Sequence, residues 1–108
     1  MPQVRMKGVT AEQVIELAPK LSARMAEITE CPSDWVEIEY LPSKVVSGGM
    51  LKLGAPFVEV YWFDRGQEQS DAVAKAITEE FQAIGIENVD VAFLLYKKEL
   101  YYENGVHF

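Results

Sequence analysis

The chain has 108 residues, of which 49% are hydrophobic and 25% are charged, and its formal net charge is −7. This length suits one domain with a single core, and the composition is that of a folded globular protein. The excess of acidic residues argues against a nucleic-acid partner, because phosphate binding needs a clustered basic surface.

Cysteine usage, hydropathy and histidine content indicate the cellular compartment and which membrane, metal or cofactor interactions to expect. Cys31 is the only cysteine, so no intrachain disulfide can form, and a reducing cytoplasm is expected. The N-terminus has no apolar run typical of a signal peptide, and no apolar stretch approaches the length of a membrane span, so no membrane partner is expected. His107 is alone, without a cluster of cysteines or histidines, so neither a metal site nor another cofactor is predicted.

The N-terminal segment predicts a strand followed by a helix. Val4 and Met6 alternate with polar residues over residues 1–8, which is the period-two pattern of a strand. Thr10 and Gln13 have the spacing of a capping box, so a helix is expected to begin there. Pro19 is expected to kink this helix, because proline lacks the N–H that bonds to the preceding turn. The apolar face of the helix is predicted to comprise Val14, Leu17, Leu21, Met25 and Ile28.

Two strands are expected before a second helix. Pro42 should bulge the first of them or confine its end to a sheet edge. The predicted segments are a turn at 31–34, a strand from Trp35 to about Val46, a turn at Ser47-Gly48-Gly49, a loop to Ala55 and a strand at 57–63.

The C-terminal part predicts a second helix, a fourth strand and a short arm. The helix is expected from about Gln67 to Ile84, and Gly85 should stop it. A strand at 89–96 follows. Beyond it, the aromatic residues near position 101 and the Asn104-Gly105 pair suggest a short strand or hairpin. The inward positions of the helix are predicted to be Val73, Ile77, Phe81 and Ile84.

The element order is therefore β-α-β-β-α-β, and it contains a repeat. Pro2 and Pro56 lie 54 residues apart, and each precedes a strand, a glycine, a helix and a second strand. One domain of two βαβ units, about 1–54 and 55–108, is expected. Its fold class would be α+β, a two-layer sandwich with a mixed sheet and both helices on one face, because such connections are right-handed. A monomeric ferredoxin-like fold has the same element order and is the main alternative.

The sheet face opposite the helices is expected to be aromatic. A sheet face in contact with water is mostly polar, whereas a large apolar patch marks an interface. We therefore predict an oligomer. Strand alternation places on this face Trp35, Leu41, Phe57, Tyr61, Phe63, Ala92, Leu94 and Tyr96.

Pro2 stands directly after Met1 and is a candidate for unusual chemistry. If Met1 is removed, Pro2 becomes the amino terminus and carries a secondary amine. An α-amine titrates near about 8, so modest perturbation leaves it neutral and basic at pH 7. The alternative is a proline that begins an edge strand without wasting a backbone donor.

Several short motifs accompany Pro2 and the two repeats. They are Cys31-Pro32 with Trp35-Val36, Leu41-Pro42-Ser43-Lys44 with Ser47-Gly48-Gly49, Pro56 with Arg65-Gly66, and the tail from Glu103-Asn104-Gly105 to Phe108. Together they resemble the tautomerase superfamily, in particular its two-repeat branch, which is similar to macrophage migration inhibitory factor. The segment Trp62-Phe63-Asp64-Arg65-Gly66-Gln67-Glu68 further resembles the DUF1904 family.

This resemblance implies a homotrimer with three pockets at subunit boundaries. In that superfamily the N-terminal proline nitrogen is the general base, and it moves a proton between carbon and oxygen of an α-keto acid or its enol. Pro2 is thereby implied as the catalytic residue, with a small-molecule carboxylate as substrate. A base of this kind needs a pKa near the working pH, and nearby cations stabilise the developing enolate.

The sequence departs from the family pattern at other pocket positions. The pocket lysine of the migration-inhibitory branch is replaced by Cys31, and its paired tyrosine and asparagine are replaced by Asp90 and Ala92. Only Pro2 carries over as a catalytic residue. Two hypotheses follow: a trimeric tautomerase, or a non-catalytic trimeric small-molecule-binding or structural protein of the same fold.

Arg65 is the cation that could compensate for the missing lysine. Its guanidinium could bind a substrate carboxylate through two parallel hydrogen bonds. The alternative is a solvated charge that caps the turn beside Asp64. Arg5 and Lys44 are further candidate substrate-binding residues.

Overall fold

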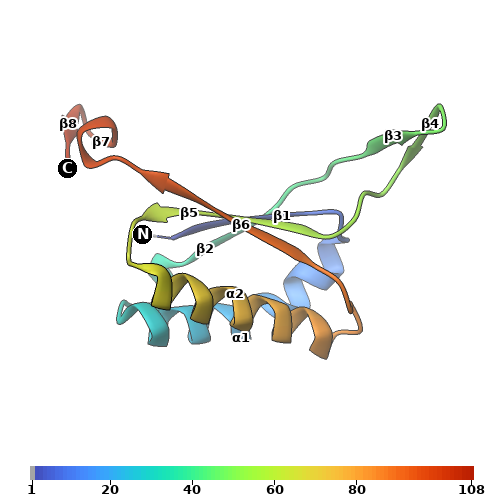
Figure 1. The fold of residues 1–108 in the computed structure, drawn as a ribbon, viewed down its shortest axis with the longest axis horizontal. Helices are drawn as coiled ribbons and strands as arrows, with labels where there is room; N and C mark the ends of the chain where they lie inside the picture. Colours follow the sequence, from blue (N-terminus) through green and yellow to red (C-terminus); the bar gives the residue numbers. More distant parts are fainter. Residues whose placement is uncertain (1) are drawn as a thin grey trace.

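The computed structural model describes residues 2–108 and shows a four-stranded sheet with two helices on one face (Figure 1). This confirms the predicted α+β two-layer fold. The elements of the body are β1 Gln3–Lys7, α1 Ala11–Thr29, β2 Glu37–Tyr40, β5 Phe57–Phe63, α2 Gln67–Ala83 and β6 Asp90–Tyr96. Two hairpins extend from it, formed by β3 Val45–Ser47 with β4 Met50–Lys52 and by β7 Tyr102–Glu103 with β8 Val106–His107.

The order of the strands separates the two folds that share this element order. The sheet runs β2-β1-β5-β6, with β1 parallel to β2, β5 parallel to β6, and the central strands β1 and β5 antiparallel. In a ferredoxin-like fold the two parallel strands of each βαβ unit are split by another strand. Here they are direct neighbours, so the ferredoxin-like alternative is wrong.

The ladder between β1 and β5 relates the two repeats by a local two-fold axis. Arg5 pairs with Glu59, which lies 54 residues later in the chain. On either side of this pair, Gln3 pairs with Tyr61 and Lys7 pairs with Phe57. The Gln3 end and the Lys7 end of the ladder therefore contain equivalent positions from the two repeats.

The strand predicted from Trp35 to about Val46 is wrong in extent. Trp35 lies in a 3-10 turn, and β2 ends at Tyr40. The backbone N–H of Leu41 still bonds to the Met6 carbonyl at 2.9 Å, but Pro42 has no N–H with which to continue the ladder. The chain therefore leaves the sheet at this point.

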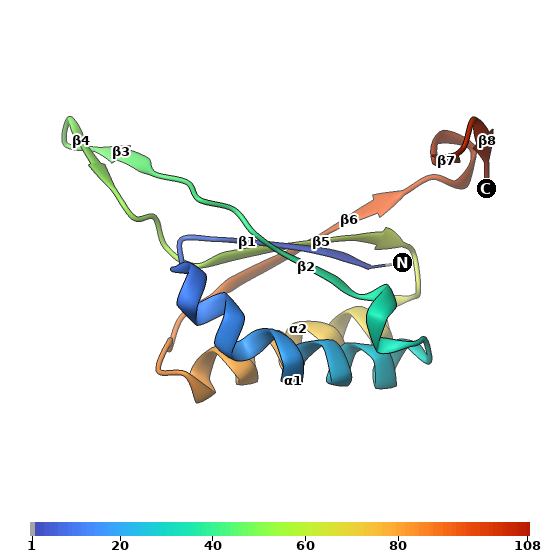
Figure 2. The same cartoon turned by 180° about the vertical axis from the view of Figure 1, so that it is seen from behind.

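The loop predicted up to Ala55 is only partly right, because Met50–Lys52 form β4 of a hairpin, whereas residues 53–55 belong to no strand. Gly48 and Gly49 form the turn of this hairpin with φ angles of 57° and 73°, which glycine adopts without steric cost. Figures 1 and 2 show this hairpin and the β7–β8 hairpin projecting from opposite ends of the sheet, on the side away from the helices. The predicted C-terminal hairpin is confirmed.

Helix α1 begins as its capping box predicts. The Gln13 N–H donates to Thr10 Oγ1 at 3.2 Å, and the Thr10 N–H donates to Gln13 Oε1 at 2.9 Å. The helix continues through Pro19, and Figure 2 shows a bend after its first turns. Helix α2 ends one residue before the predicted Ile84, and Gly85 follows with φ 90°.

The core lies between the helices and the sheet. The helix residues predicted to face inward do so, although Ile28 and Ile84 are only partly buried against it. Strand alternation would place Tyr40 and Leu95 on the sheet face beneath the helices, but both are exposed near the ends of the two edge strands. The fully buried large side chains include Met6, Val58, Val60, Trp62, Leu17, Leu21, Met25, Val73, Ile77 and Phe81. No helix within residues 2–108 is long and apolar enough to cross a membrane.

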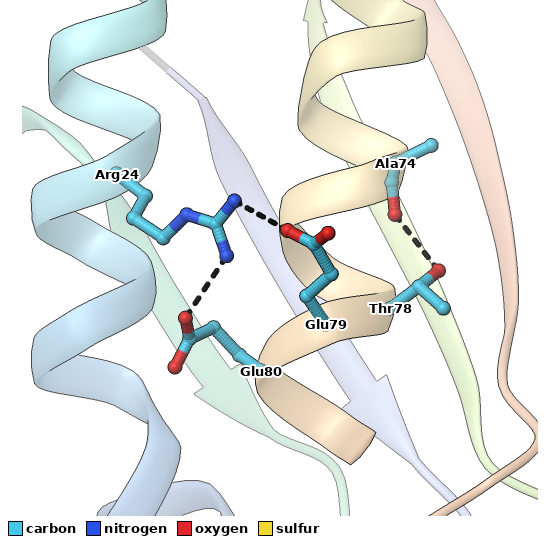
Figure 3. Close-up of polar contacts among 5 residues, drawn as sticks. All are labelled: Arg24, Ala74, Thr78, Glu79 and Glu80. Atoms are coloured by element: carbon cyan, nitrogen blue, oxygen red, sulfur yellow. Dashed lines mark hydrogen bonds and ion pairs between the residues drawn. The ribbon is translucent and has the colours of Figure 1, made fainter. Parts of the chain in front are cut away.

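Arg24 joins the two helices on their outer side (Figure 3). Its Nη2 lies 2.7 Å from Glu79 Oε1, and its Nη1 lies 3.0 Å from Glu80 Oε2. The hydrogen bond from Arg24 holds the pKa of Glu79 below its usual range. All three side chains retain contact with water, so these ion pairs add little to the stability that the core provides.

Arg24→Gln is expected to cause a small loss of stability that depends on pH. Because the pKa of Glu79 is lowered in the folded state, its contribution is present above the ordinary glutamate pKa of about 4.3 and disappears as the pH falls through the folded pKa. Urea denaturation at pH 7 and pH 3 checks this. A difference between wild type and variant that is the same at both pH values would contradict the assignment.

Candidate active site at the N-terminal end of β1

Pro2 lies at the end of a central strand, between β2 and β5. Its carbonyl accepts a hydrogen bond from the Glu37 N–H at 3.1 Å, and the pairing of Gln3 with Tyr61 places Pro2 beside Trp62. Pro2 is buried, and Trp62 has no exposed surface. The sequence alternative of an edge-strand proline does not apply, because β1 has a partner on each side.

Arg65 lies two residues after β5, at the same end of the sheet. Its Cζ is 5.6 Å from the centre of the Trp62 ring. The turn itself is held by Asp64, whose Oδ1 accepts the Gly66 N–H at 2.9 Å. No carboxylate of residues 2–108 lies within ion-pair distance of Arg65. An Arg65 side chain with no ion-pair partner there is compatible both with a solvated charge and with a site for an anion.

Three buried polar atoms of segment 62–69 have no hydrogen-bond partner within residues 2–108. They are Trp62 Nε1 and Arg65 Nε, which are donors, and Gln69 Oε1, which is an acceptor. Buried polar groups in folded proteins are almost always bonded to protein, water or ligand. Trp62 lies on β5, Arg65 lies in the turn after it and Gln69 lies in the first turn of α2. Neither Trp62 nor Gln69 is predicted as a site residue from the sequence, because the tryptophan fits a core position and no motif includes the glutamine as a functional residue.

An aromatic cluster packs against the other face of the sheet at this end. Tyr96 donates its hydroxyl to Gln3 Oε1, and its ring lies 6.1 Å from that of Tyr61. Burial raises the pKa of Tyr96, so the phenol stays protonated at neutral pH. The C-terminal arm completes the cluster through close ring contacts among Phe63, Tyr96, Tyr101 and Phe108, with centres 4.9–5.7 Å apart.

Arg5 faces away from the helices and is already bonded. Its Nε lies 3.1 Å from Glu39 Oε1, and its Cζ lies 4.6 Å from the centre of the Tyr61 ring. The Glu39 carboxylate raises the pKa of Arg5. This cation is held at the middle of the β1–β5 ladder by two neighbours from its own chain.

Lys44 lies at the opposite end of β1. It lines a cavity together with Lys7 and Gly8, at the base of the β3–β4 hairpin. A strand rises about 3.3 Å per residue, so Lys7 is roughly 17 Å from Pro2 along β1. Within one chain the structure thus brings Arg65 near the Pro2 end and leaves Lys44 at the other end.

The three residues that depart from the family pattern do not form one cluster within the chain. Cys31 is half-buried after α1, with its Sγ 3.1 Å from Thr29 Oγ1. Asp90 is exposed and pairs with Phe57, at the end of β5 remote from Pro2. Ala92 follows on the same strand face and is half-buried. Within residues 2–108, no group of three or more His, Cys, Asp or Glu side chains could hold a metal ion.

Comparison with known proteins supports the fold. A crystal structure of a DUF1904 domain from Sebaldella termitidis ATCC 33386 is 36% identical, covers 100% of both chains and has a TM-score of 0.90. A macrophage migration inhibitory factor-like protein from Entamoeba histolytica is 13% identical, with 99% of this chain and 98% of that chain covered and a TM-score of 0.71. A fused 4-OT, solved as an asymmetric trimer, is 19% identical, with 98% and 94% covered and a TM-score of 0.74. No curated protein matches the chain.

The last two likenesses show the fold alone, which this chain shares with the macrophage migration inhibitory factor-like protein and with the fused 4-OT. The family model described as a domain of unknown function (DUF1904) matches residues 1–107. The match over nearly the whole length shows that the chain belongs to the DUF1904 family.

Proposed function

We propose that this protein is a tautomerase that interconverts the keto and enol forms of a small α-keto acid, with the Pro2 nitrogen as general base. The observation that carries the proposal is the buried Pro2 at the end of a central strand, beside Trp62 and near an Arg65 that has no ion-pair partner within residues 2–108. The fold shared with superfamily members supports it.

The proposed step is a proton transfer in which all charges balance. The Pro2 amine takes a proton from the carbon next to the ketone, and the electron pair of that C–H bond forms the C=C bond of an enolate. The prolinium then returns a proton, to oxygen for the enol or to carbon for the ketone. Burial disfavours the protonated form of an amine, which favours a neutral base before substrate binds. The step requires the Pro2 nitrogen to be a free amine.

Arg65 is proposed to bind the carboxylate of the substrate. A guanidinium binds a carboxylate through two parallel hydrogen bonds, and this fixes the orientation of the keto group relative to Pro2. Trp62 Nε1 and Arg65 Nε are donors without partners within residues 2–108, and they lie in the segment where negative charge would need stabilisation.

Pro2→Ala tests the proposed base. Enolisation of phenylpyruvate is expected to fall by about 100-fold or more, which is the usual contribution of a positioned general base. The matched control is Pro56→Ala, because Pro56 is the equivalent proline of the second repeat and its nitrogen is an amide. Equal rates for wild type and Pro2→Ala would remove Pro2 from the mechanism. No rate in either would favour the non-catalytic binding protein.

We also propose that the protein is a homotrimer; the fused 4-OT was solved as an asymmetric trimer. The β3–β4 hairpin supports this, because Val46 and Leu51 on it are 73% and 71% exposed. Apolar side chains so exposed on a projecting arm suit a contact with a second copy of the chain. Light scattering is expected to give three times 12.2 kDa, and Leu51→Lys to lower that mass. A monomeric mass for wild type would contradict the assembly.

A further inference from the structure

A cavity of about 290 Å³ lies at the Lys7 end of the sheet, away from Pro2. It sits where the β3–β4 hairpin leaves the body, between the end of β1 and the start of β5. The side chains that line it are Lys7, Ser43, Lys44, Val45 and Phe57, and the remaining wall includes the 54–55 segment. It therefore has two cations and a hydroxyl beside an apolar surface.

Neither Lys7 nor Lys44 has an ion-pair partner within residues 2–108, although the whole chain has a net charge of −7. The Lys7 Nζ lies 5.3 Å from the centre of the Phe57 ring, which holds this ammonium over the apolar part of the cavity. Two unpaired ammonium groups at one cavity create a local positive potential that attracts an anion.

The local two-fold axis shows why this end is open. At this end Lys7 takes the position that Tyr61 has at the Pro2 end. Its strand partner Phe57 takes the position of Gln3. Glu37 of β2 is equivalent to Asp90 of β6, because they pair with Gln3 and Phe57. By the same offset in the sequence, Ser43, which follows the end of β2, corresponds to Tyr96 at the end of β6.

At the Pro2 end these equivalent residues fill the space. The Tyr61 and Tyr96 rings stack, and the Tyr96 hydroxyl bonds to Gln3. The Ser43 side chain is far smaller than a tyrosine ring, so the same volume is left open beside Lys7. The cavity is thus specific to the first repeat.

The wall of the cavity is held by close backbone packing. Gly8 has φ 73°, and a Cβ at this position would overlap the carbonyl oxygen of Ala55. A Cβ at Gly54 would lie 2.9 Å from Val45 Cγ1. The hairpin base and the β1 end therefore meet directly, and the cavity is formed before a ligand arrives.

We propose that this cavity binds a small carboxylate with an apolar body, independently of the reaction proposed for Pro2. The carboxylate lies between the Lys7 and Lys44 ammonium groups and accepts a hydrogen bond from the Ser43 hydroxyl. The apolar body rests on Phe57 and Val45. This combination selects an aromatic or short aliphatic acid over inorganic phosphate, which has no group to place against the apolar surface.

Benzoate is the probe, and its dissociation constant is measured by calorimetry or by shifts of the Gly8, Gly54 and Ala55 amide resonances in the full chain. Lys7→Gln and Lys44→Gln are each expected to weaken binding about fivefold or more, and higher salt should weaken it further. Lys20→Gln, an exposed lysine on α1, is the matched control and should bind as wild type.

A second variant changes volume without changing charge. Ser43→Tyr introduces the residue found at the equivalent place and is expected to abolish binding, whereas Pro2→Ala should leave it unchanged. The proposal is overturned if benzoate does not bind wild type at about 10 mM, if both lysine variants bind as wild type, or if the shifts appear around Trp62 instead. None of these results bears on whether Pro2 is a base.

Discussion

Phe81→Ala is expected to lower the free energy of unfolding by about 3–5 kcal/mol. Phe81 is fully buried on the face of α2 that packs on the sheet, so removal of its ring leaves a cavity in the core. Its carbonyl also accepts the N–H groups of Ile84 and Ile86 at 3.2 and 3.0 Å, which a backbone-preserving substitution retains. Guanidinium denaturation followed by circular dichroism measures the loss at a fixed protein concentration.

The neighbouring Gln82 provides the control for this prediction. It is exposed, so Gln82→Ala is expected to change the free energy of unfolding by less than about 0.5 kcal/mol. Small domains are stabilised by about 5–15 kcal/mol in total, so Phe81→Ala should also shift the midpoint markedly. A loss below about 1 kcal/mol would contradict the placement of Phe81 in a packed core.

Arg65→Ala is expected to lower kcat/KM for phenylpyruvate by about 10- to 100-fold, mainly through a higher KM. A hydrogen bond to a charged group contributes about 1.5–3 kcal/mol, and each 1.36 kcal/mol corresponds to about tenfold in rate. Loss of a residue that binds the substrate and the transition state equally well changes KM more than kcat. Steady-state kinetics over a range of substrate concentrations separates the two constants.

Arg65→Lys and Lys98→Ala complete that experiment. The lysine keeps the charge but loses the paired donors, so it should recover part of the activity. Lys98 is exposed in the 3-10 turn after β6 and should have no effect. Unchanged kinetics in Arg65→Ala would show that the guanidinium does not bind the substrate.

The body of the fold could be predicted from the sequence because its patterns are strong and local. Residues 57–63 alternate without interruption, and the structure has β5 over the same residues. Thr10 and Gln13 mark the start of α1 through bonds within one turn, so no distant contact is needed to predict them.

The hairpin could not be predicted because alternation does not identify a strand's partner. Apolar residues continue through Val45 and Val46, so the pattern extended the second strand into residues that leave the sheet. Pro42 was the one local signal that the strand ends. It ends the ladder after the bond from the Leu41 N–H to the Met6 carbonyl, and Met6 lies far away in sequence.

The candidate site was likewise predicted where local motifs mark its residues and missed where it depends on tertiary packing. Pro2 and Arg65 were proposed from their motifs, and both lie at one end of the sheet. Gln69 carries no local pattern, because its unpaired oxygen is a consequence of tertiary packing. The cavity at Lys7 also depends on packing, since Lys44 reaches it only after the chain leaves β2.

The most direct test of the proposed function compares two forms of the chain that differ only at the Pro2 nitrogen. In one form Met1 has been removed and the nitrogen is a free amine; in the other Met1 is retained and the nitrogen is an amide, which is not a base. Intact mass assigns each form. Phenylpyruvate enolisation is expected at least 100-fold faster with the free amine. Equal rates in the two forms would contradict the role of Pro2 as the general base.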